Sequence, residues 1–175
     1  MFRSTVDAHS SALEMLRLRP QGPGAVRKTG GYPVRVKFSD TDCTGRIYFT
    51  AYARWADDAI IEFLRSRRLT YEPAGGLRLD GHLVPETFVI GEYSCRIEHP
   101  SHYDDLLRAK VTLLDLRLRT ARFQVTIHGP ATRKQLARVE LVYVCILPST
   151  ARSARIPPSV AARLRSAARV STKHM

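Results

Sequence analysis

The chain has 175 residues, 44% of them hydrophobic and 25% charged, which is the composition of one globular domain and not of a disordered or fibrous protein. No apolar run approaches the ~20 residues that a membrane-spanning helix needs, and the first thirty residues lack the apolar core of a secretory signal. The three cysteines form no C-x-x-C pair, so we expect no disulfide framework, no metal site and a reducing, cytoplasmic location.

The net charge of +12 is concentrated at the two ends of the chain. Residues 1–30 carry a net +3 and residues 141–175 a net +6, which leaves +3 for the middle. A basic end attracts an anionic partner such as nucleic acid, an acidic carrier protein or a phosphorylated cofactor, or it simply solubilises the chain. Because the middle is nearly balanced, we do not expect nucleic acid to be the partner.

The chain divides into three predicted segments. Residues 1–31 contain a short predicted helix over 11–19 and then a run rich in Gly and Pro, which together predict a mobile N-terminal extension. Residues 32–148 form the predicted domain. Residues 149–175 are predicted to be a basic C-terminal tail with a short helix over 159–168, for which Ser159 is the expected N-cap.

Hydrophobic periodicity within 32–148 predicts an α+β fold. Alternation over 34–38 indicates a half-buried strand, and apolar steps of three and four over 50–67 indicate an amphipathic helix about 27 Å long. After a glycine-rich loop, four more strands are predicted: 88–97, 106–115, 118–127 and 136–147. The last is apolar on both faces and is placed inside the sheet. The pattern therefore predicts an antiparallel sheet wrapped around one long central helix.

The segment between the first strand and this helix is the strongest candidate for chemistry. Asp40 and Asp42 precede the helix N-terminus, whose first N–H groups have no intrahelical acceptor and can stabilise an oxyanion. A carboxylate beside them can act as a nucleophile or as a general base on water. The same residues can instead do no more than cap the turn and the helix, and spacing alone favours that alternative.

The stretch FSDTDCTGRIYFTAYARWADDAIIEFLR, residues 38–65, resembles the opening motif of the 4-hydroxybenzoyl-CoA thioesterase family, which has the hotdog fold. The segments 83–85, 96–106 and 119–123 are similar to later motifs of the family, so the resemblance covers roughly 34–147. It implies an enzyme that hydrolyses an acyl thioester of CoA or of acyl-carrier protein, without a cofactor or metal. It also implies a homodimer or homotetramer with the site at a subunit interface.

The family's catalytic carboxylate falls on Asp42 and its oxyanion donor on the backbone N–H of Phe49. Tyr48 is a third catalytic candidate, while Asp40 would shape the turn. Further candidates would contact the acyl group or the carrier: Gly45, Tyr52, Trp55, Glu62, Arg117, Arg119 and Arg122. Core packing explains the aromatic residues equally well, and a solvated surface is the alternative for Glu62 and the arginines. His99 and His102 are expected in a surface turn, and Cys43 as a small buried filler.

Two branches of the family share features with this chain. The tol–pal-associated acyl-CoA thioesterases often have His where this sequence has Phe49, whereas the helix start around Tyr52 and Trp55 resembles the enediyne polyketide branch. That branch tends to carry Asn at the position of Asp42. A polyketide-releasing carrier-protein thioesterase therefore stays open as an alternative. A non-catalytic protein that binds acyl groups or nucleic acid through the basic termini is the alternative of another class.

Overall fold

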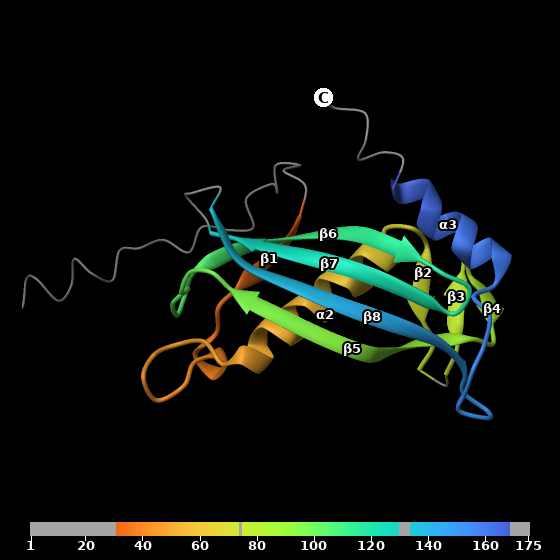
Figure 1. Ribbon diagram of the computed structural model, residues 1–175, viewed down its shortest axis with the longest axis horizontal. Helices are drawn as coiled ribbons and strands as arrows, with labels where there is room; N and C mark the ends of the chain where they lie inside the picture. The colour runs from red at the N-terminus through yellow and green to blue at the C-terminus, as the bar shows by residue number, and fades with distance from the viewer. Residues whose placement is uncertain (1–30, 74, 130–133, 169–175) are drawn as a thin grey trace, which may run out of the picture.

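The computed structural model describes residues 31–73, 75–129 and 134–168, and an antiparallel sheet is its largest element (Figure 1). The strand order is β1-β6-β7-β8-β5, and β9 pairs with β8. The strands are β1 (Tyr32–Arg35), β5 (Thr87–Ile97), β6 (Leu106–Leu116), β7 (Thr120–His128), β8 (Gln135–Leu147) and β9 (Arg152–Ser153). The four long predicted strands are confirmed to within two residues, and β8 lies inside the sheet as expected, between β7 and β5.

The first strand is shorter than predicted. It ends at Arg35, and a single 3₁₀ turn, η2 (Phe38–Asp40), follows because the Asp40 carboxylate accepts the backbone N–H of Lys37 at 2.9 Å. The predicted alternation ran on to Phe38, but that side chain is 78% exposed and belongs to the turn. The turn redirects the chain toward the long helix.

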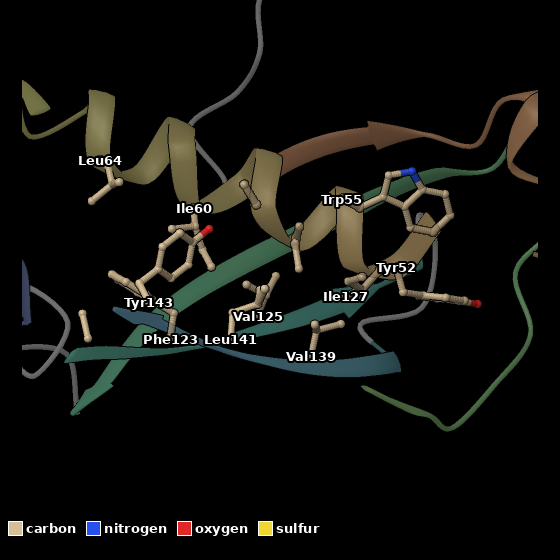
Figure 2. Close-up of a cluster of buried hydrophobic side chains, with 14 of the residues drawn as sticks. Tyr52, Trp55, Ile60, Leu64, Phe123, Val125, Ile127, Val139, Leu141 and Tyr143 are labelled. Carbon is tan, nitrogen blue, oxygen red and sulfur yellow. The ribbon is translucent and has the colours of Figure 1, made fainter. Parts of the chain in front are cut away.

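Helix α2 (Phe49–Arg65) lies behind the sheet in Figure 1 and packs an apolar stripe against it. The stripe is made of Ala51, Tyr52, Trp55, Ala56, Ala59, Ile60 and Leu64. Figure 2 shows Tyr52, Ile60 and Leu64 facing side chains of β7 and β8. Each large side chain buried in this way contributes about 1.5–3 kcal/mol. The helix ends two residues before the predicted end, and Arg68, at φ 59°, turns the chain into the next strand.

A second, three-stranded sheet was not predicted. It consists of β2 (Leu69–Tyr71), β3 (Leu77–Leu79) and β4 (His82–Val84), within the region expected to be a glycine-rich loop. Strands of three residues are too short for alternation to distinguish them from loop. Leu69 and Leu77 are each 1% exposed, so this small sheet contributes to the core.

A second α-helix, α3 (Pro158–Ala168), packs onto the domain. Val160 and Leu164 are fully buried and Ile156 nearly so, which means that the packed part of the chain extends past residue 148. The helix begins at Pro158, a residue well suited to the first helical position, so Ser159 lies inside the helix and its prediction as N-cap was wrong. The helix predicted over 11–19 falls outside the described residues. Within those residues, no helix has the length and apolar character needed to cross a membrane.

Candidate active site at the start of helix α2

The loop between η2 and α2 is held by Asp40. Its side chain is 1% exposed and pairs with the guanidinium of Arg54, while its backbone carbonyl accepts the N–H of Tyr48 at 2.9 Å. Arg54 lies one turn into α2, so these contacts tie the loop to the first turn of the helix. The structure thus places Asp40 where the resemblance implied, as a residue that shapes the turn.

Backbone contacts close the rest of the loop. Thr41 and Ile47 form an isolated β-bridge, and the N–H of Asp42 donates to the carbonyl of Arg46 at 2.7 Å. Gly45 donates to the carbonyl of Asp42 at 3.0 Å with φ +76°, a conformation that favours glycine. Gly45 therefore serves the shape of this loop.

The Asp42 carboxylate is oriented by its own loop. Its Oδ1 accepts the Thr44 backbone N–H at 2.7 Å, the Thr44 hydroxyl at 2.6 Å and the Arg46 N–H at 3.1 Å. These hydrogen bonds, chiefly that from the Thr44 hydroxyl, hold the pKa of Asp42 below its ordinary value. Its Oδ2 accepts no hydrogen bond from the described residues. The group is thus an ionised, half-exposed carboxylate with one oxygen left free.

The N-terminus of α2 is open. Ala51 donates to the carbonyl of Tyr48 at 2.9 Å, but no side chain caps the helix at Tyr48. The backbone N–H groups of Phe49 and Thr50 have no acceptor among the residues that the structure describes. Two N–H groups at the positive end of a helix make a favourable environment for an anion.

A pocket of about 470 Å³ adjoins this loop. It is lined by Arg46 and Ile47 of the loop, Tyr52 of α2 and the segment 97–102 that follows β5. Tyr52 and Ser101 are 1% and 2% exposed, and their hydroxyl oxygens lie 3.3 Å apart. His99 is half-buried and His102 exposed, and both line the pocket, so these turn histidines lie beside the candidate site.

Tyr93 of β5 also reaches the helix start, which the sequence did not indicate. Its hydroxyl donates to the backbone carbonyl of Phe49 at 3.3 Å, and burial raises its pKa. Alternation from Phe88 would place Tyr93 on the other face, but a β-bulge between Ile90 and Glu92 shifts the register and sets Tyr93 opposite the buried Leu141. The contact itself spans 44 residues and depends on the sheet register.

Two other candidates on α2 do not line the pocket beside Tyr52. Trp55 is 4% exposed, packs edge-to-face on Tyr52 with ring centroids 5.2 Å apart, and lines a separate pocket of about 120 Å³ beside β1. Glu62 pairs with Arg65 at the surface. It lies thirteen residues after Phe49, about 20 Å along the helix axis.

The turn between β6 and β7 lies at the end of the sheet opposite to the start of α2 (Figure 1), and it carries Arg117 and Arg119, with Arg122 following in β7. Arg117 pairs with Asp115 at 2.7 Å, Arg119 donates to the Ser153 hydroxyl at 2.9 Å, and Arg122 lies 3.9 Å from Glu140.

Tyr48 is 49% exposed beside the free N–H groups. Cys43 is exposed, so its prediction as a buried filler was wrong, because the loop turns it outward.

No group of three or more His, Cys, Asp or Glu in the described ranges is arranged to hold a metal ion. The loop carries a free carboxylate oxygen, and the helix start carries two N–H groups without an acceptor among the described residues. Arg46, Ile47 and Tyr52 of the same segment line a partly apolar cavity, whereas Asp42, Tyr48 and Phe49 are not among its lining residues. This arrangement can stabilise a negative charge that develops on a carbonyl oxygen while the carboxylate acts on the carbonyl carbon or on water.

Comparisons with known proteins point the same way. A family model described as the thioesterase-like superfamily matches residues 36–164. The acyl-CoA thioester hydrolase YbgC of Escherichia coli is 25% identical over 134 residues, which are 77% of this chain and 94% of that protein. The structure of Slr0204, a 1,4-dihydroxy-2-naphthoyl-CoA thioesterase from Synechocystis, superposes with a TM-score of 0.63 at 19% identity, covering 83% of this chain and 98% of that one.

A third comparison supports the fold. The structure of SAV2348 from Staphylococcus aureus, in complex with CoA, superposes with a TM-score of 0.67 at 14% identity and covers 79% of this chain and 82% of that one. The antiparallel sheet with its helices is thus a hotdog-type thioesterase fold.

Proposed function

The chain belongs to the thioesterase-like superfamily, and from this premise we propose that it hydrolyses acyl thioesters at the start of α2, with Asp42 as the catalytic carboxylate. The observation that carries the proposal is the free Oδ2 of an ionised Asp42 in a loop that is tied to an uncapped helix start and lines a pocket. The YbgC relative is named as an acyl-CoA thioester hydrolase, which supports the same reaction here.

The reaction follows one of two routes. In the nucleophilic route Oδ2 of Asp42 attacks the thioester carbonyl carbon, the C–S bond breaks, and the thiolate leaves and takes a proton from solvent. Water then hydrolyses the resulting anhydride, which releases the acid and restores the carboxylate. In the general-base route Asp42 takes a proton from the attacking water and that proton passes to the departing thiolate.

Both routes place a negative charge on the former carbonyl oxygen. The N–H groups of Phe49 and Thr50 are the donors for that oxygen, because they have no other acceptor in the described part of the chain. A single preorganised donor of this kind is worth about 10²–10³ in turnover. The exposed ring of Tyr48 and the Tyr93 hydroxyl flank this position, and the Tyr52 side of the pocket holds the acyl group.

The active unit is a homodimer in this proposal. β5 forms one edge of the main sheet, and it exposes Val89, Ile90, Tyr93 and Ile97 by 36–47%. A long edge strand with exposed apolar side chains invites pairing with another strand. In an antiparallel pair of two β5 strands, the end of one sheet that carries the turn between β6 and β7 lies beside the end of the other sheet at which α2 begins. That arrangement would bring the partner's copy of the 117–122 turn toward Asp42, although the turn lies far from Asp42 in its own protomer.

The test is thiol release from a panel of aryl-CoA, fatty acyl-CoA and carrier-protein thioesters, detected with a thiol reagent. We expect turnover of at least one class, and Asp42→Asn should reduce it by two orders of magnitude or more without lowering the melting temperature. Asp80→Asn removes one acidic charge outside the candidate site, at a position whose φ of 51° suits Asn, and is the matched control. Absence of release across the panel would favour a non-catalytic acyl-binding protein.

A further inference from the structure

The face of the main sheet that points away from α2 carries a row of cations near the candidate site. Register pairs Lys110 with Thr126, Thr126 with Arg138, and Arg138 with Arg96, so these residues cross β6, β7, β8 and β5 in one line. Arg108 lies two residues before Lys110 and on the same face. We call Arg96, Arg108, Lys110 and Arg138 the basic row.

The basic row is not neutralised within the described part of the chain. Arg96, Lys110 and Arg138 are exposed, and no carboxylate of the described residues lies within 4 Å of any of the four cations. Four carboxylates share this face; Glu92 lies opposite Val142, and Asp115 pairs with Arg117. Glu98 accepts from the Gln135 amide at 2.7 Å, and Glu140 from the Gln124 amide at 3.3 Å. Arg96 and Arg138 lie directly opposite each other on neighbouring strands and repel, and this repulsion lowers the stability of the sheet.

Arg108 adds an independent observation. Its Nη1 atom is buried and has no hydrogen-bond partner among the described residues. Buried donors in folded proteins nearly always have an acceptor, so the Arg108 guanidinium adds to the row a positive charge that no described residue neutralises. The row therefore combines unpaired charge with one unfilled donor.

The position of the row relates it to the candidate site. Arg96 immediately precedes Ile97 and Glu98, which line the pocket, and successive strand residues point to opposite faces. In Figure 1 this face is turned to the viewer, with α2 behind the sheet and α3 at the opposite end. A partner on the row would thus sit at the C-terminal end of β5, past which a flexible arm can reach the pocket lined by 97–102.

We propose that the basic row docks an acidic helix of a carrier protein that delivers the acyl group on a phosphopantetheine arm, an inference that rests on the proposed thioesterase function. From Arg96 to Lys110 the row crosses three strand spacings, about 14 Å. An acidic helix meets cations over that length with roughly nine residues, or two to three turns. One phosphate group would occupy only one or two of the cations. The row contains no aromatic side chain on which a nucleic-acid base could stack.

The experiment compares one acyl group on two carriers: octanoyl-CoA and octanoyl thioester on a purified acidic acyl-carrier protein. The variant Arg96→Glu/Arg138→Glu reverses the charge of the two facing arginines. One like-charge pair replaces another, so the repulsion between β5 and β8 at this position is not increased. The control Arg155→Glu/Arg165→Glu makes the same change in net charge at exposed positions outside the row. The milder Arg96→Gln/Arg138→Gln repeats the test should the reversal fail to fold.

We expect the row variant to lose tenfold or more in kcat/KM on the carrier-protein substrate and less than twofold on octanoyl-CoA, with the control near wild type on both. Equal losses on both substrates, or equal losses in row variant and control, would overturn the docking role. Fluorescence anisotropy of labelled carrier protein bearing phosphopantetheine tests docking without catalysis, so it separates this inference from the proposed function. Row-dependent binding of duplex DNA or RNA without binding of the carrier protein would also overturn it.

Discussion

Removal of the Asp40 carboxylate should loosen the loop that carries the candidate catalytic residue. Asp40 is almost completely buried, and its Oδ2 accepts the N–H of Lys37 at 2.9 Å while Oδ1 pairs with Arg54. Asp40→Ala leaves both donors unpaired. Asp40→Asn keeps an acceptor for Lys37 and loses only the ionic partner of Arg54.

The magnitude follows from the two contacts. The hydrogen bond from Lys37 is worth about 1 kcal/mol. The pair with Arg54 contributes about 1 kcal/mol, well below a fully buried pair, because the Arg54 side chain is 55% exposed and water screens it. We therefore expect Asp40→Ala to lower the free energy of unfolding by about 2 kcal/mol and Asp40→Asn by about 1 kcal/mol. For a chain of this size, the larger loss corresponds to about 4–8 °C in Tm.

Urea denaturation followed by circular dichroism measures both variants, and the m-value should stay unchanged. The control is Asp104→Asn, which breaks the pair with Arg35 at 3.0 Å, where both side chains are more than half exposed. Asp104 has φ 68°, a conformation that Asn accepts, so its loss should stay below about 0.5 kcal/mol. If Asp40→Ala costs no more than this control, the account of the loop is refuted.

Further predictions concern chemistry and packing. The lowered pKa of Asp42 keeps its carboxylate ionised down to acid pH, so kcat should be flat through neutrality and fall only below the ordinary Asp range; an acid limb near pH 6 that vanishes in Asp42→Asn would contradict this. Tyr143→Phe removes the donor to Asp57 and should lower the free energy of unfolding by about 1–2 kcal/mol in urea denaturation. An unchanged free energy of unfolding would show that this hydrogen bond does not stabilise the fold. Leu164→Ala should lower the free energy of unfolding by about 2–4 kcal/mol, because α3 packs its buried side chains against the domain. An unchanged melting curve would show that α3 does not contribute to the stability of the domain.

The long elements were predictable because their periodicity is a local property of the sequence. α2 and the four long strands each bury one face. Burial therefore recurs at every third or fourth residue in the helix and at every second residue in the strands. β2, β3 and β4 were not predicted, because a strand of three residues is too short to show a measurable period. The loop around Asp42 was recognisable from its acidic residues and glycine, as was its position before a helix.

The remaining features depend on contacts between distant residues. Tyr93 meets Phe49 only because β5 pairs with β8 in one register, and a shift of one residue would turn Tyr93 to the other face. The basic row likewise exists only in the register of four strands. Asp40 and Asp42 look alike in sequence, yet the fold buries the first and leaves the second half-exposed with a free oxygen. Spacing alone does not separate them; the family resemblance implied different roles, and the contacts give each carboxylate a different environment.

The backbone N–H of Phe49 is the central element of the account, and proline can remove it without removing the helix. Phe49 is the first residue of α2, where proline is well tolerated, and Tyr48 already has the extended conformation preferred before proline, with φ −57° and ψ 135°. Phe49→Ala deletes the same ring but keeps the N–H. The decisive measurement is kcat for thioester hydrolysis by these two variants: we predict a loss of about 10²–10³ for Phe49→Pro and a few-fold at most for Phe49→Ala. Equal turnover by the two folded variants would contradict the assignment of the helix start as the oxyanion site.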